Sequence, residues 1–330
     1  MNDTASGQVR AYLYDASGTD ETVELGDIDV RDLDEKKLLW VTVLDRDEQI
    51  VREIADRLHV EHVPYSAIAE KSKRPILFRF EDFFHFSINS VRLDDEGRPE
   101  KLPIDFVVGK NFVWTVHEGE IEYFEGFRDR EIGETRLGEL SAESFVATLL
   151  DLHIVSYFLA LDSIERRVDK LDAKLLRKRE LETNEFMGEM VELRSDTSKL
   201  RRWLIPHREM IYGFMRADFQ QIAKSDSAEL YRMLGEHFES AVDAIETSRE
   251  TVLSVFELFA TKSSQLTNLF VQRLTFLTLM TGTLSVIAGI LGMNYKEDFF
   301  ESPGGFWITL GGMLLVAVAL TLFARLRKWI

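Results

Sequence analysis

The chain has 330 residues, a formal net charge of −17 and no cysteine. This length has room for one substantial soluble domain and a membrane segment. The lack of cysteine excludes disulfides and thiolate metal sites, and the acidity argues against nucleic acid as a partner, because an acidic surface repels phosphate.

Residues 9 to 118 predict a mixed α/β domain, because short segments rich in aromatic and β-branched residues are bounded by Gly, Pro, Asp or Asn. The predicted strands are Val9 to Tyr14, Leu38 to Leu44, Ile76 to Phe80, Phe83 to Leu93, Ile104 to Val108 and Phe112 to Val116. Helices are expected at Asp47 to Leu58 and Pro64 to Lys71. Gly109 to Asn111 is expected to form a turn, because Gly and Asn tolerate positive φ.

From about residue 121 onward the periodicity is helical. A long helix is predicted from Ser141 to about Lys178, and a second from Thr183 to Met215 with an interruption near Pro206. We expect these two helices to form an antiparallel pair beside a third helix. The third helix is predicted to start near Ser227 and to continue to Asn294, a length that needs partner helices for stability.

Two uncharged segments lie near the end of the chain. Leu274 to Tyr295 contains no charge for 22 residues, and Ser302 to Ala324 contains none for 23. Each is long enough to cross a hydrocarbon core of about 30 Å at about 1.5 Å per residue. Only residues 296–301 separate them, so the pair is predicted to form a transmembrane hairpin.

The first uncharged segment carries a stripe of small and polar residues. Members recur every three or four residues, a spacing that keeps one face of coiled helices turned to a common axis. The stripe comprises Gly292, Gly289, Ser285, Gly282, Thr278, Thr275, Val271, Asn268, Ser264 and Thr261. Two interpretations fit: close helix packing in lipid, or the lining of a water-filled pore. Continuation of the stripe beyond the uncharged segment, and the polar Asn294 after it, favour the pore.

These residues resemble the CorA family of divalent-cation channels. The resemblance covers nearly the whole chain, and its most specific part is a Gly-Met-Asn tripeptide followed by a short loop and a final span. The matching segments are Arg74-Pro75, Gly109 to Phe112, Val116 to Glu118, Asn268, Leu274-Thr275, Gly289 to Tyr295, Phe306-Trp307 and the basic C-terminus. The resemblance implies a funnel-shaped homopentamer in which five copies of the third helix surround one pore.

The resemblance also assigns candidate site residues. Gly292, Met293 and Asn294 are expected to form the ion filter at the outer entrance, although Gly and Asn there would also suit a helix C-cap. The expected pore-lining residues are Asn268, Val271, Leu274, Thr275, Thr278, Gly282, Ser285 and Gly289. Val271 and Leu274 are candidates for an apolar gate or for ordinary helix packing.

Two charged groups carry further expectations. Residues Asp94, Asp95 and Glu96 match the place of regulatory carboxylates in magnesium-gated relatives, and the alternative is a solvated charged loop. The residues Arg325, Arg327 and Lys328 form either a basic ring at the inner mouth or an anchor for membrane topology. No cofactor is expected beyond Mg²⁺ or another divalent cation as transported ion and regulator. The sequence holds no catalytic motif, so an enzyme is not expected.

Charge placement predicts the orientation, because Lys and Arg favour the cytoplasmic side. Arg273 precedes the first span and the basic tail follows the second, whereas the loop holds one Lys against three acids. The N-terminus lacks an apolar signal sequence, so both termini are expected in the cytoplasm and the chain in the inner membrane. The expected parts are 1–140 (α/β domain), 141–226 (helix pair), 227–273 (stalk), 274–295 (first span), 296–301 (outer loop), 302–324 (second span) and 325–330 (tail).

The predicted function is uptake of divalent cations, chiefly Mg²⁺ with Co²⁺ or Ni²⁺ as further ions, through a pentameric pore. A ZntB-like zinc transporter driven by a proton gradient is one alternative, because the loop lacks an acidic Met-Pro-Glu segment and Thr283 stands where the first span often has proline. A membrane-anchored coiled-coil sensor or scaffold that transports nothing is an alternative from another class.

Overall fold

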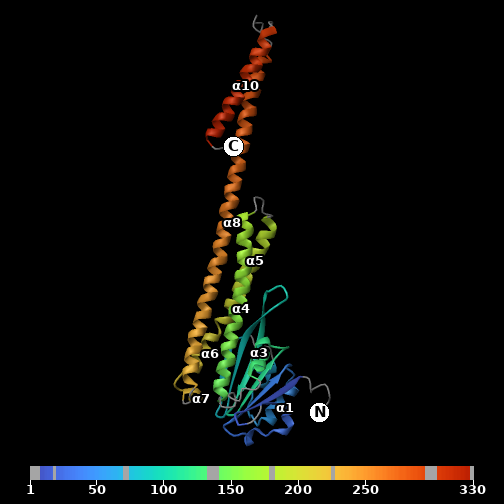
Figure 1. Ribbon diagram of the computed structural model, residues 1–330, viewed down its shortest axis with the longest axis vertical. Helices are drawn as coiled ribbons and strands as arrows, with labels where there is room; N and C mark the ends of the chain where they lie inside the picture. Colours follow the sequence, from blue (N-terminus) through green and yellow to red (C-terminus); the bar gives the residue numbers. More distant parts are fainter. Residues whose placement is uncertain are drawn as a thin grey trace. The chain divides into compact units, whose positions relative to one another are not determined.

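We describe a computed structural model of the chain over residues 8–17, 20–69, 74–131, 141–177, 183–223, 227–293 and 303–327 (Figure 1). The chain divides into two compact units, Met1–Leu253 and Ser254–Ile330, which we call unit 1 and unit 2. The boundary falls inside one helix, α8 (Ala228–Leu291), so each unit contains part of it.

Unit 1 contains a mixed sheet of seven strands in the order β2-β1-β3-β7-β6-β5-β4. Their bounds are β1 (Val9–Asp15), β2 (Glu21–Val23), β3 (Lys37–Val43), β4 (Ile76–Arg79), β5 (Phe84–Leu93), β6 (Pro99–Val108) and β7 (Phe112–His117). Strands β3 and β7 pair in parallel, and every other neighbouring pair is antiparallel. The predicted mixed sheet is therefore confirmed.

The helices are α1 (Glu48–Arg57), α2 (Tyr65–Ala69), α3 (Glu122–Glu131), α4 (Ala142–Arg177), α5 (Thr183–Leu204), α6 (His207–Phe214), α7 (Gln220–Ala223), α8 and α10 (Pro303–Leu326). Helix α1 starts where Asp47 accepts the backbone N–H groups of Gln49 and Ile50, which satisfies donors that the first turn leaves free. The predicted interruption at Pro206 separates α5 from α6.

Helices cover both faces of the sheet. On one face, Val41 and Trp114 belong to an apolar core with Ile54 of α1 and Ile68 of α2. On the other face, the Trp40 ring packs edge-on against Phe124 of α3 and Phe145 of α4, with ring centroids 5.2 and 5.4 Å away. The sheet is thus the middle layer of a three-layer domain.

Helices α4 and α5 form the predicted antiparallel pair (Figure 1). Arg167 of α4 pairs with Asp196 of α5 at 2.7 Å, and Lys174 pairs with Glu189 at 2.8 Å, so later residues of α4 meet earlier residues of α5. Helix α4 is apolar enough to cross a membrane by composition, but 67% of its apolar window is buried inside the protein. Its apolarity therefore reflects its place in the core of unit 1.

Helix side chains cover the part of β5 that β4 leaves unpaired. Among the described residues, strand β4 pairs with Phe84 to Ser87 of β5 and no further along it. Beyond it, the Asn89 N–H donates to Nε2 of His207 at 3.0 Å, and the Tyr157 hydroxyl donates to the Asn89 carbonyl at 2.6 Å. These bonds satisfy backbone groups that an open sheet edge would leave free to pair with another chain.

A buried ionic cluster ties the start of α1 to the sheet. The Arg46 guanidinium lies 2.5 Å from one oxygen of Asp105, and the His85 ring lies 3.0 Å from the other. Arg46 also donates to the carbonyl of Ile68 at 2.7 Å. Arg46 and Asp105 are both buried, and burying their charges is tolerated only because they are paired.

The structure contains elements that the sequence analysis did not predict. They are strand β2, the first half of β6, helix α7 and two short 3-10 helices at Leu25–Asp27 and Val30–Asp32. The turn after β6 is where we expected it, but neither Gly109 nor Asn111 has positive φ. Gly109 is needed for another reason: a Cβ there would lie 2.1 Å from the Phe112 ring.

Candidate functional site

The predicted pore-lining residues all lie on the surface of α8. Each of the eight, from Asn268 to Gly289, is exposed in the chain, and so are Gly292 and Met293. Continuous helix from Ala228 to Leu291 gives these residues the spacing that the sequence predicted. The stripe therefore exists as one exposed strip along the helix.

A different face of α8 is covered within unit 2. Partly buried residues recur at helical spacing at Gln272, Phe276, Met280, Leu284, Ile287 and Leu291. Helix α10 lies beside this part of α8, and a groove between them is lined by Leu284 together with Trp307, Met313 and other residues of α10 (Figure 1). At 3.6 residues per turn, the covered residues and the stripe lie on roughly opposite faces of α8. The stripe is therefore not the surface that packs on α10.

The threonine hydroxyls of α8 have a defined orientation. Thr275 donates its hydroxyl hydrogen to the Val271 carbonyl at 2.8 Å, and Thr278 donates to the Leu274 carbonyl at 2.9 Å. Because the hydrogen is used inside the helix, the oxygen lone pairs remain for an outside group. With Gly282, these threonines line a shallow groove along α8, so the stripe presents acceptor oxygens beside a glycine with no side chain.

The end of α8 brings backbone oxygen to the surface. The Gly292 N–H donates to the Ala288 carbonyl at 2.9 Å, and the Met293 N–H donates to the Ile290 carbonyl at 3.3 Å. The last carbonyls of a helix have no hydrogen-bond partner within the helix, so Gly292 and Met293 lie at the end of α8 where backbone carbonyl oxygens are unpaired. Asn294, the third residue of the predicted filter, lies outside the described residues.

The basic residues at the end of α10 are only partly described. Arg325 is exposed, and the Arg327 guanidinium lies 5.8 Å from the centre of the Phe323 ring. Lys328 lies outside the described residues. The basic ring and the topology anchor both remain predictions.

The predicted regulatory loop is bonded within itself. The Asp94 carboxylate accepts the N–H groups of Arg98 at 2.8 Å and Glu96 at 2.9 Å, which hold the pKa of Asp94 below its ordinary value. Glu96 pairs with Arg98 at 2.5 Å, and Gly97 at φ +74° lets the loop turn. In the part of the chain that the structure describes, no three His, Asp or Glu side chains converge to hold a metal.

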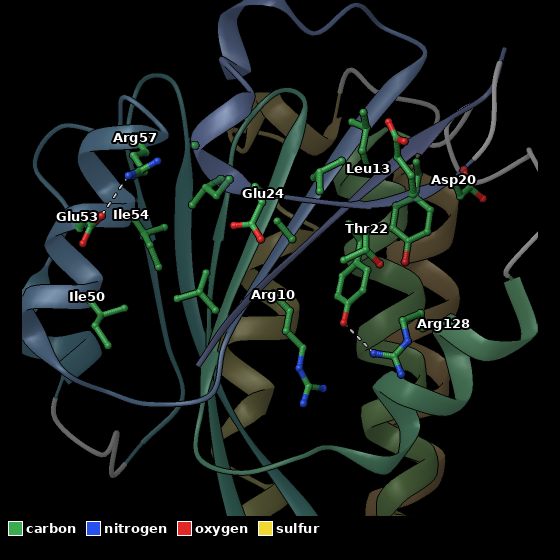
Figure 2. Close-up of a pocket in the computed structure, with 18 residues that line it drawn as sticks. Arg10, Leu13, Asp20, Thr22, Glu24, Ile50, Glu53, Ile54, Arg57 and Arg128 are labelled. Atoms are coloured by element: carbon green, nitrogen blue, oxygen red, sulfur yellow. Dashed lines mark hydrogen bonds and ion pairs between the residues drawn. The ribbon is translucent and has the colours of Figure 1, made fainter. Parts of the chain in front are cut away.

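Sequence reasoning missed a cavity of about 600 Å³ at the edge of the sheet (Figure 2). It is lined by residues of β1, β2, α1 and α3, which share no sequence motif. Its arginines have carboxylate partners: Arg10 pairs with Glu120 at 2.9 Å, Arg57 pairs with Glu53 at 3.2 Å, and Arg128 pairs with Glu125 at 3.9 Å. These contacts leave no uncompensated positive charge to recognise an anion.

An α/β unit joined to apolar helices that are long enough to cross a membrane, one of which carries an acceptor-rich stripe, is typical of a membrane transport protein. The family described as CorA-like Mg2+ transporter protein matches residues 35–326. The chain belongs to this family and is a divalent-cation transporter of the membrane.

Individual relatives agree with this assignment. A cobalt/magnesium transport protein CorA of Thermotoga maritima is 22% identical over 284 residues, covering 85% of this chain and 80% of the relative. The complete structure of a CorA magnesium transporter from Methanocaldococcus jannaschii superposes with a TM-score of 0.79 at 19% identity, covering 97% of this chain and 98% of the other. The cytoplasmic domain of ZntB from Vibrio parahaemolyticus gives a TM-score of 0.61 at 14% identity, covering 78% of this chain and 99% of that domain.

Proposed function

We propose that this chain assembles as a homopentamer and passes Mg²⁺ into the cell through a central pore lined by the stripe of α8. The observation that supports this most is the placement of the stripe opposite the face that α10 covers. A stripe used for packing of the two helices would be covered by α10. An exposed strip of hydroxyls and glycines in a membrane segment needs water or further copies of the chain beside it.

The stripe suits a hydrated cation. Thr275 and Thr278 turn oxygen lone pairs outward, so in a ring of copies they accept hydrogen bonds from the water shell of a cation. Mg²⁺ sheds its water reluctantly, which favours a pore that contacts the ion through that shell. Val271 and Leu274 are exposed apolar residues at the inner end of the first uncharged segment, and in the ring they form a constriction that closes by losing water.

The proposed pore has an ion filter at its outer entrance and a fixed orientation in the membrane. Gly292 and Met293 supply backbone oxygen at the end of α8, and the Asn294 amide adds a side-chain oxygen at the outer entrance. Both termini lie in the cytoplasm, following the basic residues that flank the two spans. The membrane potential then drives entry of a doubly charged ion by about 2.3 kcal/mol per charge per 100 mV.

Flux into liposomes that contain the purified protein tests the function. We expect saturable uptake of Mg²⁺ and Co²⁺ that responds to membrane potential and needs no proton gradient. Uptake of Zn²⁺ that stops when the proton gradient is removed would establish the ZntB-like alternative instead. If none of the three ions is taken up, the result favours the membrane-anchored scaffold that transports nothing.

The variant Asn294→Ala tests the filter. Removing the amide takes one ring of oxygens from the entrance, and we expect Mg²⁺ uptake to fall at least about tenfold. The control is Ser302→Ala, a small polar residue at the start of the second uncharged segment, which should transport normally. Equal uptake by the two variants would remove Asn294 from the mechanism.

A further inference from the structure

A small polar pocket lies between α5 and α8 inside unit 1. Its volume is about 150 Å³, well below the roughly 300 Å³ or more of pockets that hold organic ligands. The lining residues are Arg194, Thr197 and Ser198 of α5 and Arg249, Val252 and Leu253 of α8. On each helix they follow an i, i+3, i+4 pattern, so one ridge of each helix faces the other across the pocket.

The register of the two helices places the pocket's polar groups. Arg201 of α5 pairs with Glu246 of α8. Arg208 of α6, seven residues later in the chain than Arg201, pairs with Glu239, seven residues earlier than Glu246. The same antiparallel register sets Ser198 opposite Arg249. Arg194 lies about one helical turn, or about 6 Å, further along. Ser198 therefore lies about one turn from Arg194 on α5 and opposite Arg249 on α8.

The pocket is positively charged in an otherwise acidic protein. None of its six lining residues is acidic, whereas the chain has a net charge of −17. Glu246 lies 3.3 Å from the Arg249 guanidinium but already pairs with Arg201. Both arginines have exposed side chains, and among the described residues Arg194 has neither a hydrogen bond nor an ion pair. Two cations that share a pocket repel each other unless an anion lies between them.

We propose that this pocket binds a phosphate group. Each guanidinium presents a planar set of donors that matches an oxyanion, and Ser198 adds a hydroxyl donor between them. Thr197 plays no donor role, because its hydroxyl donates to the Leu193 carbonyl at 2.7 Å. A bound phosphate group would link α5 to α8 and would neutralise the charge that Glu246 leaves uncompensated.

Calorimetric titration of the purified full-length protein with sodium phosphate tests the site. The buffer is free of magnesium and matched in ionic strength with sodium chloride. We expect saturable binding of one phosphate per chain. Arg194→Gln and Arg249→Gln should each weaken binding at least about tenfold, because each removes charge-assisted hydrogen bonds. The matched control is Arg202→Gln, an exposed arginine of the same helix outside the pocket, which should bind as the wild type does.

Vesicles identify the source of the phosphate group. Binding of free phosphate but not of vesicles with phosphatidic acid assigns a soluble ligand, and the reverse assigns a lipid headgroup. Either result supports the site if the double variant, which carries both Arg194→Gln and Arg249→Gln, loses this binding and keeps the wild-type thermal midpoint in chloride. The proposal is overturned if the wild type binds neither probe, or if the double variant binds as tightly as the wild type. Loss of assembly in the double variant, without phosphate binding by the wild type, would show that a carboxylate of a second copy fills the pocket instead.

Discussion

Asp105 is a fully buried carboxylate that two other buried side chains contact. It accepts from Arg46 at 2.5 Å and lies 3.0 Å from the His85 ring. In Asp105→Asn the Arg46 guanidinium stays charged and buried without its counter-ion, so we expect the free energy of unfolding to fall by about 3 to 5 kcal/mol. Urea unfolding of the purified protein, followed by the fluorescence of the buried Trp40 and Trp114, measures this change.

The control for Asp105→Asn is Glu100→Gln. Glu100 pairs with Arg92 at 2.9 Å, but both side chains are about half exposed. An exposed pair contributes less than about 1 kcal/mol. Similar losses of unfolding free energy in the two variants would show that burial does not decide how much an ion pair contributes to stability.

His207 makes stability depend on pH. In its neutral form Nδ1–H donates to the Leu204 carbonyl at 2.9 Å and Nε2 accepts the Asn89 N–H. Burial lowers the pKa of His207 to about 4. The unfolded chain takes up this proton near pH 6.5, whereas the folded chain does so only near pH 4. Stability is therefore full above about pH 6.5 and falls by about 3 kcal/mol as the pH decreases to about 4.

Comparison of thermal midpoints across this pH range isolates the contribution of His207. His207→Gln should flatten the slope between pH 6.5 and 4, although other buried histidines such as His117 still contribute to it. His62→Asn, on the exposed surface, should leave the slope unchanged. A wild-type slope in His207→Gln would show that this ring is already charged in the folded protein.

At the scale of elements, the two apolar helices of unit 2 give a matched pair of variants. Thr278 lies in the exposed stripe of α8, and Thr321 lies on α10, yet both donate their hydroxyl to a carbonyl four residues earlier. Valine has the same shape without the oxygen. If the proposed pore is right, Thr278→Val should slow Mg²⁺ flux several-fold, and Thr321→Val should leave it near normal. Equal effects would show that the stripe does not face the ion.

Sequence patterns predicted most elements because their signals are local. The strand periodicity of Phe84 to Leu93, the break at Pro206 and the spacing of small residues in α8 are each contained in a short segment. Strand β2 has only three residues and no alternation to detect, so its pairing with β1 could be found only in the fold.

Features that join distant segments could not be predicted from the sequence. Arg194 and Arg249 share a pocket only because two helices have a particular register. The bond between His207 and Asn89 spans 118 residues of sequence. For the candidate site, periodicity indicated which residues share one face of α8, but only the structure showed that α10 covers the opposite face.

At the scale of the whole molecule, exposure of the apolar helices argues for assembly. The most apolar windows of α8 and α10 have no buried residues within the chain. Lipid suits most of this surface, but the polar stripe needs water or other subunits. We expect native mass spectrometry in detergent to give one species of five chains, each of 38.1 kDa. A monomer or dimer would contradict the proposed central pore.

The covering of β5 has a consequence for synthesis of the protein. The strand is complete at Leu93, but the histidine that accepts the Asn89 N–H is translated 118 residues after Asn89. At about 5 to 20 residues per second, the ribosome needs about 6 to 24 seconds to make that interval. During this time the nascent chain carries an open β-edge that other newly made chains could join. A holding chaperone that binds early and leaves once α6 has emerged would protect the strand through this interval.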